Sequence, residues 1–299
     1  MQWLADVFSD WQGSLFESVL QPLMFHMGLG NLLPDAYNAT GWLLVGVIQL
    51  LVLLVVIGPM ERWWPVQSVT DRKAVWVDVL YTLIHRLGLF RVVLFFTLDP
   101  LFDAAFGALR VAGWQTFQLD ALWPGVTDVP WVSLLIYLVV LDFVDYWIHR
   151  AEHHWNWWWQ LHALHHAQTQ LTMWSDNRNH LLDDVIRAVI LVVVAQAIGI
   201  APGQFVAIVA FTQLSESFQH ANVRIWFGRV GERLWISPRF HRLHHAVGLG
   251  HESHGRQTLG GHNFGVLLPW WDMLLGTANF EHRFDPTGVR DQVEQGRDY

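Results

Sequence analysis

Histidine is concentrated in one part of this chain, and its spacing is regular. The segment at 149–168 reads HRAEHHWNWWWQLHALHHAQ and holds six histidines and four tryptophans. Eight histidines of the chain form three boxes: His149 and His153 as HxxxH, His162, His165 and His166 as HxxHH, and His241, His244 and His245 as HxxHH. Residues three and four apart share one face of an α-helix, so each box can aim two or three imidazoles at one point.

These boxes predict a metal centre. Eight ligands exceed the coordination number of one ion, so we expect two ions in adjacent sites. The chain has no cysteine, which leaves nitrogen and oxygen ligands and makes Fe, Zn, Cu and Ni the candidate metals. A single catalytic zinc needs only three protein ligands, and a two-metal hydrolase would add bridging carboxylates. A pair of iron ions held by neutral imidazoles suits the activation of O₂ against a C–H bond of a lipid.

Four further residues could orient or complete the centre. Asp142 and Asp145 precede His149 by two turns and one turn of an apolar helix, where an acid is costly. We predict that both orient ligating imidazoles, with a capping or headgroup role as the alternative. His180 and His220 each lie at the edge of an apolar segment, and their spacing alone leaves open whether they bind metal.

The composition indicates an integral membrane protein. The 299 residues are 53% hydrophobic and only 15% charged, with 19 tryptophans and a mean hydropathy of +0.25. Soluble domains carry about 25% charged residues, and tryptophan favours the bilayer interface. The net charge of −8 and the absence of P-loop, GxGxxG and GxSxG motifs exclude nucleic-acid binding, nucleotide chemistry and serine hydrolysis. The first forty residues contain no Lys or Arg, so we expect a retained segment lying on the membrane surface, not a signal peptide.

The apolar runs predict the elements that position the histidines. An uncharged run at 41–60 has the length of a membrane span, and the basic residues that follow it place the N-terminus outside. Residues 74–98 predict either a span with functional polar groups or a bent, partly interfacial helix. A span at 130–149 would deliver His149 to the cytoplasmic end, after an outside loop at 99–129.

The second half of the chain completes this pattern. A long apolar stretch at 185–214 is broken by Gly199 to Gly203 and predicts a hairpin that enters and leaves from one side. The polar remainder, 219–299, is expected to be cytoplasmic, so all the boxes fall on one side of the membrane. The Gly- and His-rich segment at 248–265 is expected either to shape a substrate entrance or to be a mobile loop.

The boxes in their context resemble the fatty acid hydroxylase / sterol desaturase superfamily of membrane di-iron proteins. The matching text is DFVDYWIHRAEHHWNWWWQLHALHHAQTQ, NRNHLLDD, FQHANVRI, SPRFHRLHHAVG and GHNFGVLLPWWDMLLGT, and ERWWP after the first span is similar as well. The resemblance covers about 130–280, roughly half of the chain. Its HxxxH box is closer to the sterol-oxidising and small bacterial members than to fatty acyl 2-hydroxylases, which have a longer box.

The resemblance implies a fold, a cofactor and a ligand set. The fold is an all-α integral membrane protein with four to five transmembrane or hairpin helices and a cytosolic cap of histidine-bearing helices. The cofactor is a di-iron centre that uses O₂ and two electrons to hydroxylate or desaturate a lipid. The implied metal ligands are His149, His153, His162, His165, His166, His241, His244 and His245, joined by His180 and His220.

The sequence also predicts the regions of the chain, its partners and its location. The expected regions are an interfacial and transmembrane part at 1–129, a catalytic domain at 130–282 and a polar tail at 283–299. Electrons must come from a separate ferredoxin or cytochrome with its reductase, because the chain has no dinucleotide motif and no cysteine set. The arginines at 224, 229, 233, 239 and 242 could dock that carrier or contact anionic headgroups. A bacterial inner membrane is the expected location.

The sequence alone leaves two other functions open. A histidine-rich metal transporter should hold its ligands at mid-membrane within the spans. A membrane zinc hydrolase should carry a general-base glutamate, as HExxH does, and Glu152 in HRAEHH is a partial match. The predicted function remains lipid hydroxylation, or else desaturation, and the lipid itself is left open among sterols, fatty acyl chains and other membrane lipids.

Overall fold

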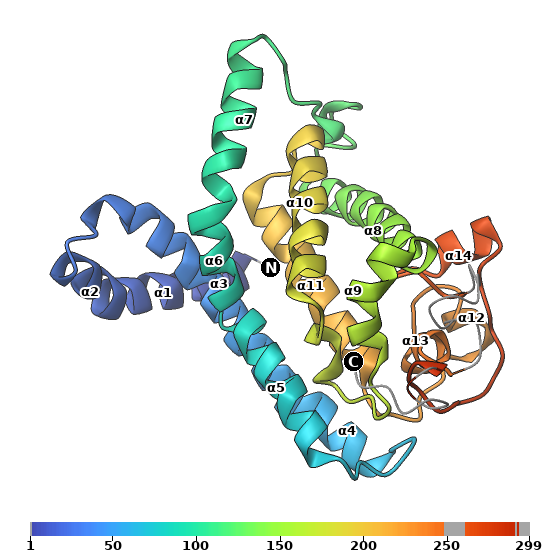
Figure 1. The fold of residues 1–299 in the computed structure, drawn as a ribbon. Coiled ribbons are helices and arrows are strands. Elements are labelled where there is room, and N and C mark those ends of the chain that lie inside the picture. The colour runs from blue at the N-terminus through green and yellow to red at the C-terminus, as the bar shows by residue number, and fades with distance from the viewer. Residues whose placement is uncertain (1, 248–260, 291, 293–299) are drawn as a thin grey trace.

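The computed structural model describes residues 2–247, 261–290 and 292 of the chain (Figure 1). Within those residues the regular structure is helical, and the β-structure recorded is one isolated bridge between Ala246 and Thr287. The predicted all-α class is therefore confirmed. Most of the segment at 248–265, which was predicted either to shape a substrate entrance or to be a mobile loop, lies outside the described residues.

The helices follow one another with short connections. The N-terminal part contains α1 (Gln2–Leu15), η1 (Phe16–Leu20), α2 (Gln21–His26), η2 (Gly30–Leu32), α3 (Leu33–Val52), η3 (Leu53–Ile57), α4 (Gly58–Trp63), α5 (Arg72–Arg86), α6 (Leu89–Thr97), α7 (Asp99–Val111) and η4 (Leu119–Ala121). The second part contains α8 (Pro130–His154), α9 (Asn156–His166), η5 (Ser175–Asn177), α10 (Leu181–Ile198), α11 (Pro202–His220), α12 (Gly228–Gly231), α13 (Pro238–His244) and α14 (Trp270–Leu275).

Two of the described helices are long and apolar enough to cross a membrane. One is the continuous helix Gly30–Trp63, which contains the predicted span at 41–60, and the other is α8, Pro130–His154. The pair α5 and α6 passes the same test together, with a bend of 50° between them. The bend falls at Gly88, whose φ of +81° suits a residue without a Cβ. The predicted bend in 74–98 is confirmed, and whether the bent pair spans the membrane or lies partly at its interface stays a prediction.

One predicted loop is partly helical. Residues 99–129 were expected to form an outside loop, but Asp99–Val111 forms α7. Proline in its first turn lacks only an N–H that a helix leaves unpaired there, and Ala, Leu and Phe then recur at helical spacing. Three of the five charged residues that suggested a loop, Asp99, Asp103 and Arg110, are exposed on this helix, while the segment from 112 to 129 is mostly irregular.

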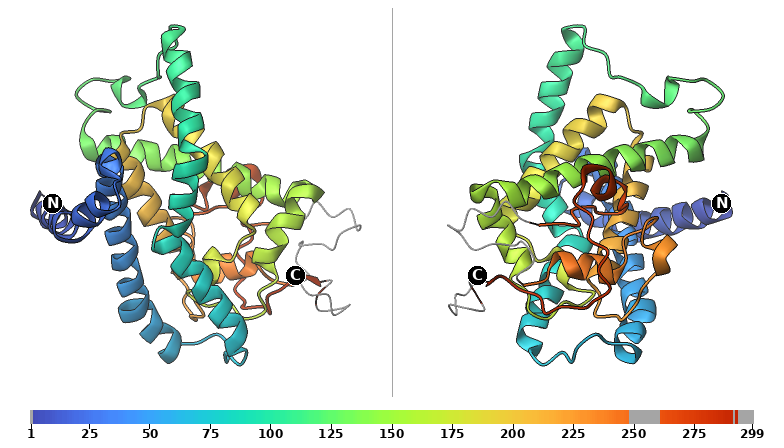
Figure 2. Two further views of the ribbon diagram at one scale, coloured as in Figure 1. Left: turned by 60° about the vertical axis from the view of Figure 1, so that its left-hand side comes forward. Right: turned by 90° about the vertical axis from the view of Figure 1, so that its right-hand side faces the viewer.

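The apolar stretch after the histidines forms the predicted hairpin. α10 ends at Ile198 and is capped by Gly199, whose φ is +79°, and α11 begins at Pro202. Both helices pack on α8 (Figure 2). The shared core contains Tyr137, Leu141 and Ile208, and the Tyr137 hydroxyl bonds the carbonyls of Ile198 and Gly199 at 3.3 Å each.

A buried arginine joins the N-terminal helices to this bundle. Arg86 at the end of α5 donates to Gln49 of α3 at 3.3 Å and to Gln213 of α11 at 2.6 Å. It also pairs with Asp176 at 2.9 Å. Because buried charges need such partners, this network fixes α3, α5 and α11 relative to one another. At the same point α3 and α5 approach closely, since a Cβ on Gly46 would lie 1.7 Å from the Arg86 carbonyl oxygen.

The close contact between Gly46 and Arg86 predicts the effect of adding one methyl group at Gly46. Gly46→Ala should push α3 away from α5 and weaken the Arg86 network, and we expect a loss of about 2–3 kcal/mol in the free energy of unfolding. The matched control is Gly107→Ala in α7, where nothing lies within 4 Å of the added Cβ and the substitution should be neutral or mildly stabilising. Thermal unfolding in detergent would compare the two. Equal midpoints for both variants would contradict the tight contact.

Candidate metal centre

Nine of the ten histidines predicted as ligands come together in two groups of five and four. The first group is His149, His153, His162, His166 and His244, and the second group is His165, His220, His241 and His245. Within each group one ring nitrogen from every residue lies within 4.8 Å of all the others, and every member is buried. The end of α8, α9, the end of α11 and α13 supply these side chains.

The two groups adjoin each other. Consecutive residues of α9 divide between them, because His165 faces the second group and His166 faces the first. The rings of His166 and His245, one from each group, stack with centroids 4.2 Å apart. Two ions bound in the groups would therefore be neighbours.

The outer nitrogens of several rings are held by backbone carbonyls. Nδ1 of His149 lies 2.9 Å from the carbonyl oxygen of Phe264. Nδ1 of His244 lies 2.8 Å from the carbonyl oxygen of His262, and Nδ1 of His220 lies 2.8 Å from that of Glu216. A carbonyl only accepts, so Nδ1 of each ring carries the proton and Nε2 keeps a lone pair. This tautomer is the one that binds a metal through Nε2.

The inner nitrogens of the second group fit a bound cation. Nε2 of His220 lies 3.0 Å from Nε2 of both His165 and His241, and the latter lies 3.2 Å from Nε2 of His245. One lone pair on His220 cannot serve two neighbours well as a hydrogen-bond acceptor. Nitrogens at about 2.0–2.1 Å from one metal ion lie about 3 Å apart, so these spacings match a shared metal.

The charge state of His165 agrees with this arrangement. Burial lowers the pKa of His165 well below its ordinary value, and the neighbouring histidines His220 and His162 lower it further. The ring is therefore neutral at physiological pH, as a metal ligand must be.

Two carboxylates hold His162, and the sequence did not identify either as its partner. The oxygens of Asp183 and Glu152 lie 3.2 and 3.4 Å from its Nδ1. Burial lowers the pKa of His162, but the two carboxylates outweigh it and the net direction is upward. Trp158 fixes Asp183 through an indole bond of 2.6 Å, and Arg187 fixes Glu152 at 3.1 Å. Such partners make a ligating imidazole more basic.

The carboxylates of Asp142 and Asp145 have other partners. Asp142 accepts the backbone N–H groups of Leu267 and Leu268 at 2.7 and 3.3 Å, and Asp145 pairs with Arg187 at 3.4 Å. Both carboxylates therefore act on the imidazoles through other groups. Asp142 anchors the segment that carries the Phe264 carbonyl, and Asp145 shares the arginine that holds Glu152. Their predicted role in orienting ligands stays a prediction in this indirect form.

His180 lies apart from both groups. It is exposed at the N-cap of α10, where its Nδ1 accepts the N–H of Leu182 at 3.2 Å. A capping side chain satisfies one of the unpaired donors of the helix start. The sequence treated His180 and His220 alike because both border apolar segments, and only the packing of α11 against α13 distinguishes them.

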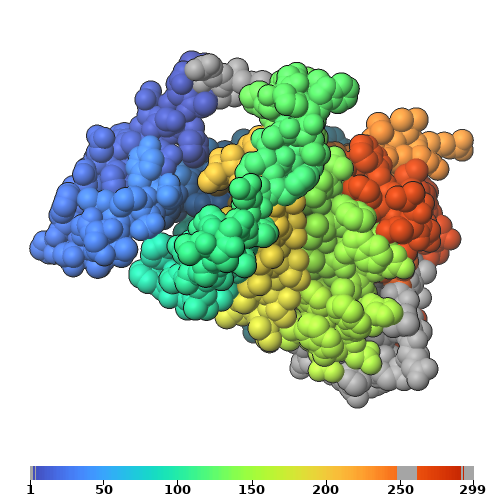
Figure 3. Space-filling view, turned by 90° about the horizontal axis from the view of Figure 1, so that it is seen from above, coloured from blue at the N-terminus to red at the C-terminus, as the bar shows by residue number. Residues whose placement is uncertain are grey.

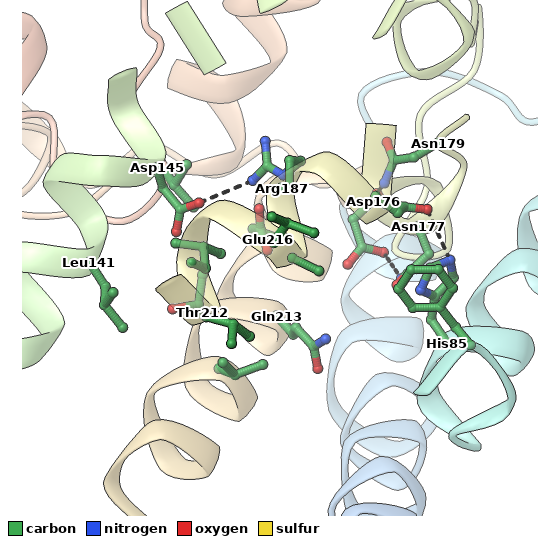
Figure 4. A pocket seen from close by; sticks show the side chains of 18 of the residues that line it. His85, Leu141, Asp145, Asp176, Asn177, Asn179, Arg187, Thr212, Gln213 and Glu216 are labelled. Atoms are coloured by element: carbon green, nitrogen blue, oxygen red, sulfur yellow. Dashed lines mark hydrogen bonds and ion pairs between the residues drawn. The ribbon is translucent and has the colours of Figure 1, made fainter. Parts of the chain in front are cut away.

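A cavity of about 270 Å³ joins the histidines to the apolar helices. Its wall includes His149, His165 and His220 together with apolar side chains of α6, α10 and α11 such as Leu94, Leu191 and Ile208. Figure 4 shows a polar site in this wall, where Asp145 pairs with Arg187 and Glu216 lies next to the same guanidinium. The cavity thus brings apolar side chains and members of both histidine groups into one wall.

The fold and the site define an integral membrane protein with a buried, paired-histidine candidate metal centre. Residues 134–277 match the family model of the fatty acid hydroxylases. The chain belongs to the fatty acid hydroxylase / sterol desaturase superfamily.

Curated relatives of the chain act on several kinds of lipid. Ornithine lipid hydroxylase OlsE of Rhizobium tropici is 26% identical over 245 residues, which cover 81% of this chain and 70% of that protein. Alkylglycerol monooxygenase of Caenorhabditis elegans is 27% identical over 60% of this chain and 32% of that protein. Delta(7)-sterol 5(6)-desaturase erg3C of Aspergillus fumigatus is 28% identical over 52% of each chain. No solved structure matches the chain.

The contact between Asp183 and His162 predicts how metal affinity depends on a neighbouring acid. Asp183→Asn removes the charge that holds the His162 ring, and we expect a 10- to 100-fold loss of metal affinity. The adjacent Asp184→Asn is the matched control, since Asp184 pairs with His85 at 3.3 Å and lies outside both groups. Competition for metal against a chelator of known affinity measures the difference. Equal affinities in the two variants would contradict the assigned role of Asp183.

Proposed function

We propose that the protein is a membrane oxidoreductase that hydroxylates, or else desaturates, a C–H bond of a lipid. The observation that carries this proposal is the cavity, which brings imidazoles of both groups and the apolar side chains of α6, α10 and α11 into one wall. A lipid chain entering from the bilayer would reach the histidines without crossing water. Membership of the superfamily and the lipid-modifying relatives support the same reaction class.

The residues present fit a pair of iron ions. His149, His153, His162, His166 and His244 would hold one ion, and His165, His220, His241 and His245 would hold the other. Iron bound there would supply the means to activate O₂ with two electrons, which are delivered by a separate ferredoxin or cytochrome with its reductase. An all-nitrogen donor set without thiolates is compatible with this metal.

The chain's own residues position the substrate and keep the site dry. Leu141 of α8 and Ile208 of α11 form a packed apolar wall along the cavity, which would align a hydrocarbon chain. Burial of the nine histidines would limit the access of bulk water to a reacting carbon. Arg187 pairs with both Glu152 and Asp145, so part of the charge in the polar wall is compensated by internal pairing.

Two observations count against the rival functions of zinc hydrolase and metal transporter: the pairing of Glu152, and the position of the histidines along α8. Glu152 is fully buried, paired with Arg187 and adjacent to His162, so it is committed to orienting an imidazole and is poorly placed as the free general base of a zinc hydrolase. A transporter would place its ligands at mid-membrane, whereas His149 and His153 occupy the last turns of α8.

The relatives support a membrane lipid as the substrate without choosing one. Their names include an ornithine lipid hydroxylase, an alkylglycerol monooxygenase and sterol desaturases. The ornithine lipid hydroxylase aligns with 81% of the chain, so ornithine lipids are the first substrates to test. Sterols, alkylglycerols and fatty acyl chains follow. The proposed location is a bacterial inner membrane with the histidine groups on the cytoplasmic side.

Lipid mass spectrometry of cells with and without the protein tests this proposal. A lipid that gains one oxygen atom, or loses two hydrogen atoms, should appear only with the protein and only in the presence of O₂. His165→Ala should abolish the product, because it removes a buried member of the second group. The matched control is His154→Ala, an exposed neighbour outside both groups, which should retain the product. A product formed without O₂ by a protein that contains only zinc would contradict the proposal.

A further inference from the structure

We propose that α14 is a membrane-embedded element whose outward face contacts lipid hydrocarbon. The sequence assigned all residues after 219 to the cytoplasm, because the region is polar on average. The packing of α14 against α8 points to a different position for residues 264–275. This inference does not depend on the proposed reaction.

The contacts of α14 fix its depth relative to a membrane span. Trp271 packs on Phe143 with ring centroids 4.7 Å apart, and its indole N–H donates to Asp142 at 2.8 Å. Both partners lie in the middle of α8, which is a candidate span. Phe143 precedes His149 by six residues, which is about 9 Å along a helix at 1.5 Å per residue. α14 therefore lies beside the membrane half of α8 and not beyond its cytoplasmic end.

The outward face of α14 is apolar. The exposed fractions are 43% for Trp270, 44% for Met273 and 74% for Leu274, whereas the acid of the helix, Asp272, is fully buried. Exposed Phe143 and Trp147 of α8 lie next to it and extend the same surface. In water this continuous apolar surface would be unfavourable. Its continuity with the exposed stripe of a spanning helix identifies the bilayer as its partner.

Four N–H groups of the irregular backbone before α14 are satisfied by buried carboxylates, which suits a position in the membrane interior. Asp272 accepts the N–H groups of Phe264 and Gly265 at 2.8 and 2.7 Å, and Asp142 accepts those of Leu267 and Leu268. Non-helical backbone is tolerated at membrane depth only where protein buries it. Residues 264–268 are all buried, so this condition is met.

The start of α14 lies at a polar boundary. The Trp270 indole donates to the Arg233 carbonyl at 3.0 Å, and Arg233 is exposed. Tryptophan and arginine are typical of the interface between hydrocarbon and headgroups. Figure 3 shows the segment that contains α14 against α8, with the segment around residue 230 beside it at the same edge of the molecule. Exposed Val230 and Leu234 belong to that neighbouring segment.

The absence of cysteine makes this position directly measurable. Leu274→Cys introduces a single thiol, which can carry a nitroxide label in protein reconstituted into phosphatidylcholine and phosphatidylglycerol nanodiscs. Power-saturation EPR then compares the accessibility of the label to O₂, which concentrates in hydrocarbon, and to a water-soluble nickel chelate. Val55→Cys, exposed within the first span, is the lipid reference. Glu281→Cys, an exposed site after α14, is the aqueous reference.

We expect the label at 274 to match the label at 55, with a ratio of O₂ to nickel accessibility several-fold above that at 281. Met273→Cys should give the same result and serves as a second site if Leu274→Cys folds poorly. Nickel accessibility at both sites equal to that at 281 would overturn the proposal. That outcome would identify the α14 face as a cytosolic surface for a protein partner.

Discussion

The candidate centre depends on one constraint, which is that each imidazole must be neutral and must direct a lone pair inward. A ring meets this condition when an acceptor holds its outer N–H. Phe264, His262 and Glu216 supply carbonyls for this purpose, and Asp183 supplies a carboxylate. The Glu216 carbonyl lies one turn before His220 in α11, but the other acceptors come from distant parts of the chain, so the fold must hold their segments in place. Asp142, Asp272 and Arg187 do this, because their bonds fix the segment at 264–268 and the side chain of Glu152.

The sequence identified which histidines could bind metal, because ligand spacing on a helix is a local property. It could not divide them into groups. His165 and His166 are neighbours in the chain, yet they face different groups. This depends on how α13 packs against α11 and on the ring contacts of His244 and His245 with the histidines of α9. His180 and His220 had equivalent positions at the ends of apolar runs, and tertiary packing brought only His220 into a group. Asp183 was missed as a partner of His162 because nothing in its local pattern points to a side chain on another helix.

The fold shows the same division between local and tertiary information. Apolar length predicted the spans and the α10–α11 hairpin, and a glycine at positive φ marks both the hairpin turn and the bend after α5. Charge content misled at α7, because charged residues on the exposed side of a helix resemble those of a loop. Average polarity also hid α14, a short apolar helix whose depth is set by Asp142 and Phe143 of α8. Asp142, an acid in the middle of an apolar span, thus binds backbone and side-chain groups of the segment that includes α14. The sequence had predicted that its role is to orient an imidazole.

The central claim is that the histidines form two separate, adjacent metal sites. It is tested most directly by the number of metal ions per chain, measured by mass spectrometry of the purified protein and two variants. The wild type should hold about two ions, His220→Ala should hold about one, and His180→Ala should keep about two. His220 belongs to the second group, whereas His180 caps α10. Equal metal content in the two variants, or about one ion in the wild type, would contradict the account.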